Sequence, residues 1–370
     1  MNTISSRKAY IDNIRWSVVS LVIVYHIIYL FNSAGVITNI DVPGIKEMDY
    51  PLYFVYPWFM ALMFVVAGMS ARYALQKRSG KEFAKERAKK LLIPSIAVIF
   101  LLGWISGWVT NQYTDMSAIG GDTMPGFFKY LIYCLCGIGV TWFARELFLA
   151  CIVLLIVRLF DKKDKLYNFC KKANIWVLLL LVIPVWGSSM ILNTPFIEVY
   201  RNGFYIFMFL LGYFVFSHEE VTDRLVKFKI PLLIIAVITG IAHSIYYFGT
   251  NYSSQECLQS FFTNAYAWIM ILALIGCFKA WFNKENKFTR YMTKRSFSFY
   301  LIHYPPLSLM AYLLTTYLDL PMIFNYIILL VAEIIILPIS YEILSRIPVI
   351  RFLLLGISKK KNSDISKNTV

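Results

Sequence analysis

The chain has 370 residues, of which 59% are hydrophobic, 17% aromatic and only 15% charged, which excludes a soluble domain of this length. Its net charge of +15 would suit a nucleic-acid-binding protein if the chain were soluble. Here the basic residues gather in short loops between apolar runs, so we exclude nucleic acid as a partner and expect membrane lipid instead.

The apolar runs have the length of membrane-spanning helices, about 17–25 residues, and they do not alternate with period two as barrel strands do. We therefore predict an all-α integral membrane protein with about ten transmembrane helices. The predicted spans cover roughly residues 11–33, 51–73, 92–110, 140–160, 175–192, 203–218, 230–249, 260–282, 297–318 and 323–345. The shorter segment 125–139 is expected to be an interfacial or re-entrant piece.

With a cytoplasmic N-terminus, nearly all of the 36 Lys and Arg residues fall on the inner side. The positive-inside rule then places both termini in the cytoplasm, which requires an even number of spans. We expect one membrane-embedded domain over residues 1–346, a short basic cytoplasmic tail over 347–370, and no attached soluble domain. The six cysteines have neither metal-ligand spacing nor the pattern of a secreted disulfide framework.

The first span carries two ionisable residues, Arg15 and His26, eleven positions apart. Eleven steps return both side chains to one helix face, about 16 Å apart. Ionisable groups in lipid are costly and mark candidate functional sites. The alternatives are a buried His satisfied by a neighbouring helix, and an Arg that extends to the membrane interface.

The most basic loop reads QKRSGKEFAKERAKK over residues 76–90. Such a loop can simply anchor the protein at anionic lipid headgroups. It can also bind a polyanionic cytosolic ligand, because Arg and Lys form charge-assisted hydrogen bonds with phosphates.

Five sequence blocks resemble the membrane acyltransferase 3 family, in the same order along the chain. The first, YIDNIRWSVVSLVIVYH at 10–26, has that family's Arg, ten intervening residues and His. The others are FMALMFVVAGMSARYAL at 59–75, FAKERAKKLLIP at 83–94, TWFARELF at 141–148 and FSFYLIHYPPL at 297–307. Two positions depart from the family's pattern: Lys90 replaces the second of two Arg, and Thr141 stands where a His is usual.

The resemblance implies transfer of an acyl group, most often acetyl from cytosolic acetyl-CoA, to a hydroxyl of an envelope carbohydrate, glycolipid or related acceptor. The acyl-CoA is a co-substrate, and no bound cofactor or metal is expected. The location implied is the bacterial cytoplasmic membrane. Because some relatives carry an extracytoplasmic catalytic domain, this chain is expected either to deliver the acyl group directly or to use a partner protein.

Site roles follow from the resemblance and from residue chemistry. His26 is the expected catalytic base, since a hydroxyl attacks a thioester poorly until a base removes its proton; imidazole can also act as a nucleophile. Arg15 is expected to bind the donor or give electrostatic support, with Asp12 orienting it from one turn away. The expected donor-binding cations are Arg72, Arg87 and Lys90.

Several other residues are candidates for support or acceptor binding. Trp142, Arg145 and Glu146 lie near the expected outer mouth, where Arg145 and Glu146 can also be a structural pair. His303 and Glu333 are expected to make a polar contact between the last two spans, or to take part in the chemistry. His218 and Asp223 have a His-x4-Asp spacing typical of other acyltransferases, but that family's accompanying blocks are absent.

Two other functional classes remain open from the residues alone. A secondary transporter or flippase would be favoured by paired broken helices, which the sequence does not contain. A non-catalytic membrane scaffold does not explain two ionisable side chains on one face of the first span.

Overall fold

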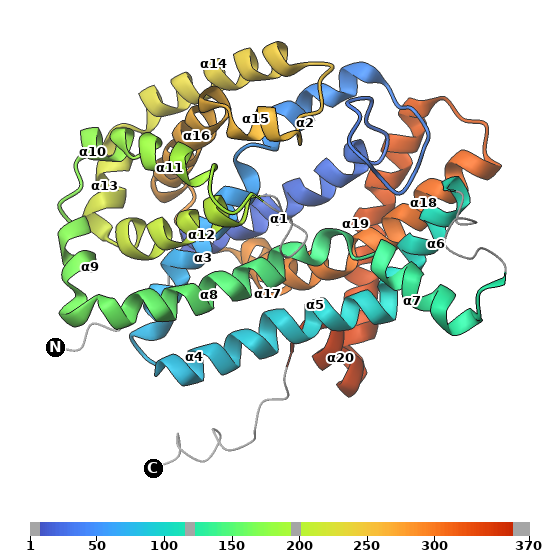
Figure 1. The fold of residues 1–370 in the computed structure, drawn as a ribbon, viewed down its shortest axis with the longest axis horizontal. Coiled ribbons are helices and arrows are strands. Elements are labelled where there is room, and N and C mark those ends of the chain that lie inside the picture. Colours follow the sequence, from blue (N-terminus) through green and yellow to red (C-terminus); the bar gives the residue numbers. More distant parts are fainter. Residues whose placement is uncertain (1–7, 115–122, 194–200, 358–370) are drawn as a thin grey trace.

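The computed structural model describes residues 8–114, 123–193 and 201–357, and within these ranges the chain is all-helical, without a strand (Figure 1). Seven of these helical stretches are long and apolar enough to cross a membrane, and a pair bent by 94° would make an eighth. The all-helical prediction is confirmed, and the apolar helices agree with a multi-pass membrane protein. The seven cover Ala9–Tyr29, Lys46–Leu75, Gly80–Tyr113, Gly139–Phe160, Lys229–Tyr247, Phe261–Trp281 and Met322–Arg346.

The α-helices of the described ranges are α1 (Ala9–Tyr29), α2 (Tyr50–Val55), α3 (Phe59–Leu75), α4 (Gly80–Arg87), α5 (Ile93–Val98), α6 (Trp104–Tyr113), α7 (Gly126–Cys136), α8 (Trp142–Phe160), α9 (Lys165–Cys170), α10 (Ile175–Leu180), α11 (Val182–Ser188), α12 (Asn202–Leu211), α13 (Glu219–Lys227), α14 (Lys229–Tyr247), α15 (Gln255–Gln259), α16 (Phe261–Trp281), α17 (Lys287–Ile302), α18 (Tyr304–Tyr317), α19 (Met322–Arg346) and α20 (Pro348–Leu355). Short 3-10 or π segments are η1 (Lys46–Asp49), η2 (Ala88–Leu92), η3 (Ile99–Gly103), η6 (Gly139–Thr141), η7 (Lys162–Asp164) and η8 (Gly212–Phe216).

Besides the bent pair, which falls on the predicted span 203–218, two predicted spans contain no helix long enough to cross a membrane. The segment expected at 297–318 consists of α17 and α18, which meet at His303. Pro305 and Pro306 explain the break, because neither has a backbone N–H to continue the helix of α17. The segment expected at 175–192 consists of the short helices α10 and α11. The count of ten spans is therefore not reproduced among the described helices.

The segment expected to be interfacial or re-entrant, 125–139, contains α7, which has 11 residues. At a rise of about 1.5 Å per residue it is too short to cross a membrane. It packs closely on α6, where Gly107 of α6 lies against the backbone of Tyr133 with no room for a side chain.

The predicted tail begins with structure of its own. Residues Pro348–Leu355 form the apolar helix α20, which packs on α5, α17 and α19. Residues 358–370 lie outside the described ranges. The start of the tail is therefore attached to the bundle.

The helix α1 lies in the middle of the bundle, in contact with α3, α16, α17 and α19 (Figure 1). Next to it, α3 crosses α12 and the start of η8 with glycine on both sides: Gly68 of α3 lies against the carbonyl of Phe209, and Gly212 of η8 lies against that of Val65. A side chain at either glycine would collide with backbone, which no rotamer change can relieve. This close crossing fixes the position of α3, the helix whose Ser70 contacts Arg15.

The helical stretch Gly80–Tyr113 contains two wide π turns, η2 and η3. Its start is fixed by a capping box, in which Ser79 and Glu82 satisfy each other's backbone N–H groups. Pro94 follows η2 closely, and its missing N–H and bulky ring disfavour a regular turn there. Within this irregular turn Lys90 and Leu91 line the same cavity as Arg87, which immediately precedes it.

Candidate functional site

His26 of α1 contacts His303, at the junction of α17 and α18. The Nδ1 atom of His26 lies 3.2 Å from Nε2 of His303 and 2.8 Å from the carbonyl oxygen of Val22. His303 is fully buried, and its Nδ1 lies 2.7 Å from the carbonyl oxygen of Tyr300. His26 itself is partly exposed. The break between α17 and α18 thus brings a second imidazole to the first.

Carbonyl oxygens only accept hydrogen bonds, so these contacts assign the hydrogens on both neutral rings. His303 donates from Nδ1 to Tyr300, which leaves its Nε2 as an acceptor. His26 donates from Nδ1 to Val22 and towards His303. The lone pair of His26 is therefore on Nε2, the ring atom that can accept a proton or attack a carbonyl carbon.

Aromatic rings surround His26. Edge-on contacts come from Tyr25, Tyr29 and Tyr304, with ring centroids 5.3, 5.7 and 5.3 Å from the imidazole. Tyr25 in turn packs on Phe59 of α3, at 5.0 Å. No carboxylate accepts a hydrogen bond from either imidazole in the described ranges.

Arg15 lies towards the other end of α1, and its side chain hydrogen-bonds to residues of α1 and α3. It donates to Asp12 at 2.7 Å, the contact expected from their spacing, and to the hydroxyl of Ser70 on α3 at 2.8 Å. The side chain of Arg15 keeps 29% of its surface exposed. Its guanidinium is therefore held in place and still accessible.

The exposed part of Arg15 faces a cavity of about 560 Å³, within the size range of ligand sites. Its walls come from α1, α3, α4, η2, α8, α12 and α17. Five of the lining residues are cationic and one is acidic. The lining consists of Lys8, Ile11, Asp12, Arg15, Met63, Ala67, Ser70, Ala71, Tyr73, Gln76, Lys77, Arg87, Lys90, Leu91, Phe143, Leu147, Cys151, Phe209 and Phe297.

The cavity extends along α3 towards the level of His26. Ser70, which binds Arg15, and Met63 both line it, whereas Phe59 contacts Tyr25, the neighbour of His26. Met63 and Phe59 are one turn apart, about 6 Å. His26 does not line the cavity. The turn of α3 between Met63 and Phe59 separates the end of the cavity from the level of His26.

Of the three cations expected to bind the donor, two line this cavity. Arg87 and Lys90 face it, and Lys90 also forms an ion pair with Glu86 at 2.7 Å. Arg72 does not line the cavity. It forms two hydrogen bonds with Asp164, at 3.1 and 3.0 Å, and its guanidinium stacks on the ring of Tyr167. The hydrogen bond from Arg72 lowers the pKa of the Asp164 carboxyl.

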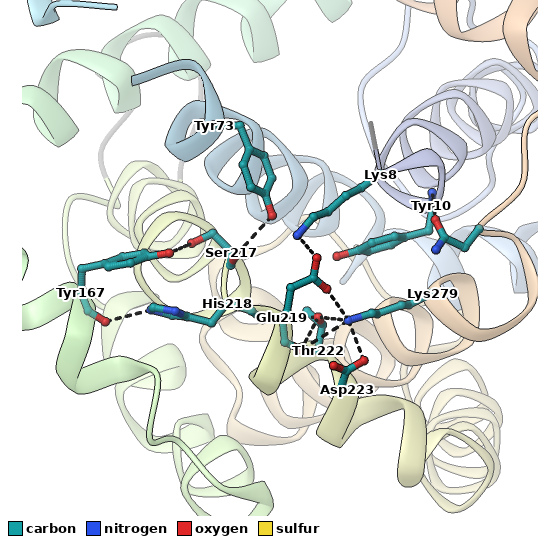
Figure 2. A network of polar contacts seen from close by, with 11 residues as sticks. Lys8, Tyr10, Tyr73, Tyr167, Ser217, His218, Glu219, Thr222, Asp223 and Lys279 are labelled. Atoms are coloured by element: carbon teal, nitrogen blue, oxygen red, sulfur yellow. Dashed lines mark hydrogen bonds and ion pairs between the residues drawn. The ribbon is translucent and has the colours of Figure 1, made fainter. Parts of the chain in front are cut away.

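Lys8, for which the sequence predicts no role, is a further cation of the cavity wall. Figure 2 shows Lys8 directed at Glu219, which also binds Lys279 at 2.7 Å. Lys279 binds Asp223 at 2.8 Å, so one network joins α1, α13 and α16. Burial alone would lower the pKa of Lys8, but hydrogen bonds with Glu219 and Tyr73 outweigh it and leave this pKa raised. Counting the Arg and Lys residues of each loop does not show which of them pair with acidic side chains.

Figure 2 also contains the two residues of the His-x4-Asp spacing, His218 and Asp223. His218 donates from Nε2 to the backbone carbonyl of Tyr167 at 2.9 Å, while Asp223 is paired with Lys279 (Figure 2). These two residues therefore contact different partners and do not form an acid–base pair.

The residues at the start of α8 lie beside α17. Trp142 packs on Tyr205 at 5.3 Å, and Phe143 packs on Tyr300, one turn before His303. Arg145 donates to the hydroxyl of Thr141 at 2.7 Å. Glu146 is fully buried, and no hydrogen bond reaches its carboxylate oxygens within the described part of the chain.

The expected contact between His303 and Glu333 is not seen. His303 contacts His26 instead, and the buried carboxylate of Glu333 receives no hydrogen bond from the described residues. The motif HYPP at 303–306 could have indicated this. A double proline predicts a helix break, and a break there changes the direction in which His303 points.

An apolar helical bundle that holds an imidazole pair near a cationic cavity fits the class of membrane-embedded acyltransferases. The comparison with protein families agrees: the acyltransferase domain model of the acyltransferase 3 family matches residues 8–341. The chain belongs to this family and is an acyltransferase, as the five sequence blocks predicted.

Two similar proteins are both named glucans biosynthesis protein C. The one from Escherichia coli (strain SMS-3-5) is 24% identical over 397 residues, which cover 98% of each chain. The one from Salmonella typhimurium (strain LT2) is 23% identical over 373 residues, which cover 95% of each chain. No solved structure matches the chain significantly.

Proposed function

We propose that this protein is an O-acyltransferase of the bacterial cytoplasmic membrane, which moves an acyl group, acetyl in the simplest case, from cytosolic acyl-CoA to a hydroxyl of an envelope carbohydrate. The name of the two relatives favours a glucan as the acceptor. The observation that carries the proposal is the placement of Arg15 in a cationic cavity and of His26 on the same helix, about 16 Å away.

That separation suits acyl-CoA. The pantetheine arm of this donor holds its thioester well away from its phosphates, so phosphate-binding cations and the catalytic group should lie apart along one path. Arg15, Arg87 and Lys90 line the cavity that would hold the phosphates. Arg forms bidentate bonds with phosphate, whereas Lys contributes a point charge. Met63 and Ala67 extend the wall of this cavity towards the level of His26.

His26 supplies the base. In the proposed step the acceptor oxygen bonds to the acyl carbon while its proton passes to Nε2 of His26. The bond between the acyl carbon and sulfur then breaks, and the CoA thiolate takes the proton from the imidazolium. Atoms and charge balance, and no metal or cofactor is required. The alternative, in which Nε2 first carries the acyl group, uses the same lone pair.

The decisive experiment measures acetyl transfer by the purified protein in lipid vesicles. Radiolabelled acetyl-CoA is the donor and a glucan oligosaccharide is the acceptor, and release of CoA is followed separately. We expect His26→Gln to abolish release and transfer while acetyl-CoA still binds. His243→Gln is the matched control, because His243 is another buried histidine, bonded to Thr263 at 3.0 Å.

The outcomes distinguish the possibilities. Label that stays on the wild-type protein but not on His26→Gln would identify the acyl-histidine route. A folded wild-type protein that neither binds acetyl-CoA nor releases CoA would refute the proposal and favour the transporter alternative.

A further inference from the structure

We propose that His303 is the positioning residue of the catalytic base: its Nε2 shares the Nδ1 hydrogen of His26 with the carbonyl of Val22, supports that tautomer of His26 and stabilises the imidazolium formed during transfer. This inference rests on the proposed role of His26. It assigns to His303 a task that carboxylates perform in many other acid–base sites.

The geometry leaves one arrangement for two neutral rings. His303 must donate from Nδ1 to Tyr300, at 2.7 Å, because a carbonyl oxygen has no hydrogen to give. Its Nε2 is therefore an acceptor, and it lies 3.2 Å from Nδ1 of His26. If His303 carried a hydrogen on Nε2 as well, two N–H groups would face each other. The pair is therefore complementary only while His303 is neutral.

The bond matters most after His26 has taken a proton. In the neutral ring the single Nδ1 hydrogen is shared between the carbonyl of Val22, at 2.8 Å, and Nε2 of His303, at 3.2 Å. Once Nε2 is protonated, the positive charge spreads over both nitrogens, and hydrogen bonds from a charged donor are about twice as strong as neutral ones. His303 thus stabilises the charged form more than the neutral one. An interaction that strengthens as charge develops raises the turnover rate.

A neutral imidazole has a further advantage over a carboxylate at this position. No carboxylate hydrogen-bonds either ring in the described ranges, and the neighbouring side chains include Tyr25, Tyr29, Tyr300 and Tyr304. An ionised carboxylate in such surroundings would favour the imidazolium before the substrate binds. His303 orients the base and leaves Nε2 unprotonated.

The chain secures His303 through its backbone. Its N–H donates to Phe299, and its carbonyl accepts from Leu307, so the residue closes α17 and opens α18. Pro305 and Pro306 follow it at the start of α18 and set this turn. The same break that ends α17 therefore aims the ring at α1.

Two substitutions test the inference. His303→Gln can place a side-chain oxygen near the position of Nε2 and keep an acceptor, whereas His303→Leu is similar in size and has none. We expect His303→Leu to lower kcat about 100-fold with an unchanged KM for acetyl-CoA, and His303→Gln to stay within about tenfold of the wild type. Thermal unfolding and acetyl-CoA binding are measured for both variants.

If the role of His303 were purely structural, His303→Gln would not retain a higher kcat than His303→Leu. Equal losses of kcat in two folded variants would overturn the inference, and so would a wild-type rate in His303→Leu. A rise in KM without a fall in kcat would also overturn it. If the wild-type protein shows no transfer at all, it is the proposed function that fails. Spectra of ¹⁵N-labelled histidine check the tautomer independently, with the His26 hydrogen expected on Nδ1 in wild type.

Discussion

Arg15 joins two helices, because its guanidinium donates one hydrogen bond to Asp12 of its own helix and another to Ser70 of α3. The pairing leaves part of the side chain exposed to the cationic cavity. Arg15 is therefore oriented before any ligand arrives, and little side-chain entropy remains to be lost on binding.

The first prediction concerns this residue. Arg15→Gln removes the charge and should raise the KM for acetyl-CoA about tenfold, with a smaller change in kcat, because a charge-assisted bond to phosphate is lost. Steady-state kinetics in vesicles measure both constants. Arg346→Gln, at the exposed end of α19, is the control. A fall in kcat with KM unchanged would instead assign Arg15 to the chemical step.

The basic loop gives a second prediction. Neutralising Arg87 and Lys90 together should weaken acetyl-CoA binding at least tenfold, and the loss should shrink in high salt, which screens exposed charges. Lys85→Gln is the matched control, because Lys85 lies on the same helix and does not line the cavity. Isothermal titration with acetyl-CoA measures the effect. Equal losses in both variants would indicate a general effect of membrane-surface charge.

Arg72 provides a prediction about pH. Because Arg72 lowers the pKa of Asp164, their interaction stabilises the fold above the ordinary pKa of Asp, about 3.9, and is lost as the pH falls through the lower folded value. Asp164→Asn should therefore lower the Tm by a few degrees at pH 7 and by less near pH 3, where protonation of Asp164 has begun. Thermal unfolding in detergent at both pH values gives the comparison.

The same pair tests the donor-binding role first assigned to Arg72. Since Arg72 is occupied by Asp164 and lies outside the cavity wall, Arg72→Gln should leave the KM for acetyl-CoA unchanged at pH 7. A large rise in KM in a folded variant would restore the original assignment.

The glycine crossing of α3 and α12 predicts a stability effect. Gly68→Ala and Gly212→Ala should each cost about 1–3 kcal/mol, because the added methyl group meets a backbone carbonyl across the crossing. Gly187→Ala serves as control, since nothing lies within 4 Å of the added atom. The readout is the Tm together with the yield of folded protein, and similar values for all three variants would contradict the close crossing.

Membrane sidedness is open to a labelling experiment. If the N-terminus is cytoplasmic, a cysteine at Ile37, which is 91% exposed, should react with an impermeant maleimide added to intact cells. A cysteine at Lys85 should react only after the membrane is permeabilised. Both are introduced into a cysteine-free background. The opposite pattern would reverse the orientation and place the cationic cavity outside the cytosol.

Local patterns predicted much of this architecture. The first span, the pairing of Asp12 with Arg15 and the basic loop before Pro94 all follow from spacing within one segment. The contact of His26 with His303 joins residues 277 positions apart and depends on how the helices pack, which no local pattern records. The count of ten spans is not confirmed for a related reason: average apolarity identified 297–318, while two prolines decided its shape.

The turn of α3 between Met63 and Phe59 has a consequence for the cell as well as for the enzyme. In the proposed function the cavity opens to the cytosol and His26 serves the other compartment, so a continuous path between them would form a pore. Here Phe59, Met63 and Tyr25 are each at least 93% buried, so the two levels are separated by packed side chains. Under the proposed function, this packed layer would limit the leakage of protons and other ions through the bundle while the donor binds in the cavity.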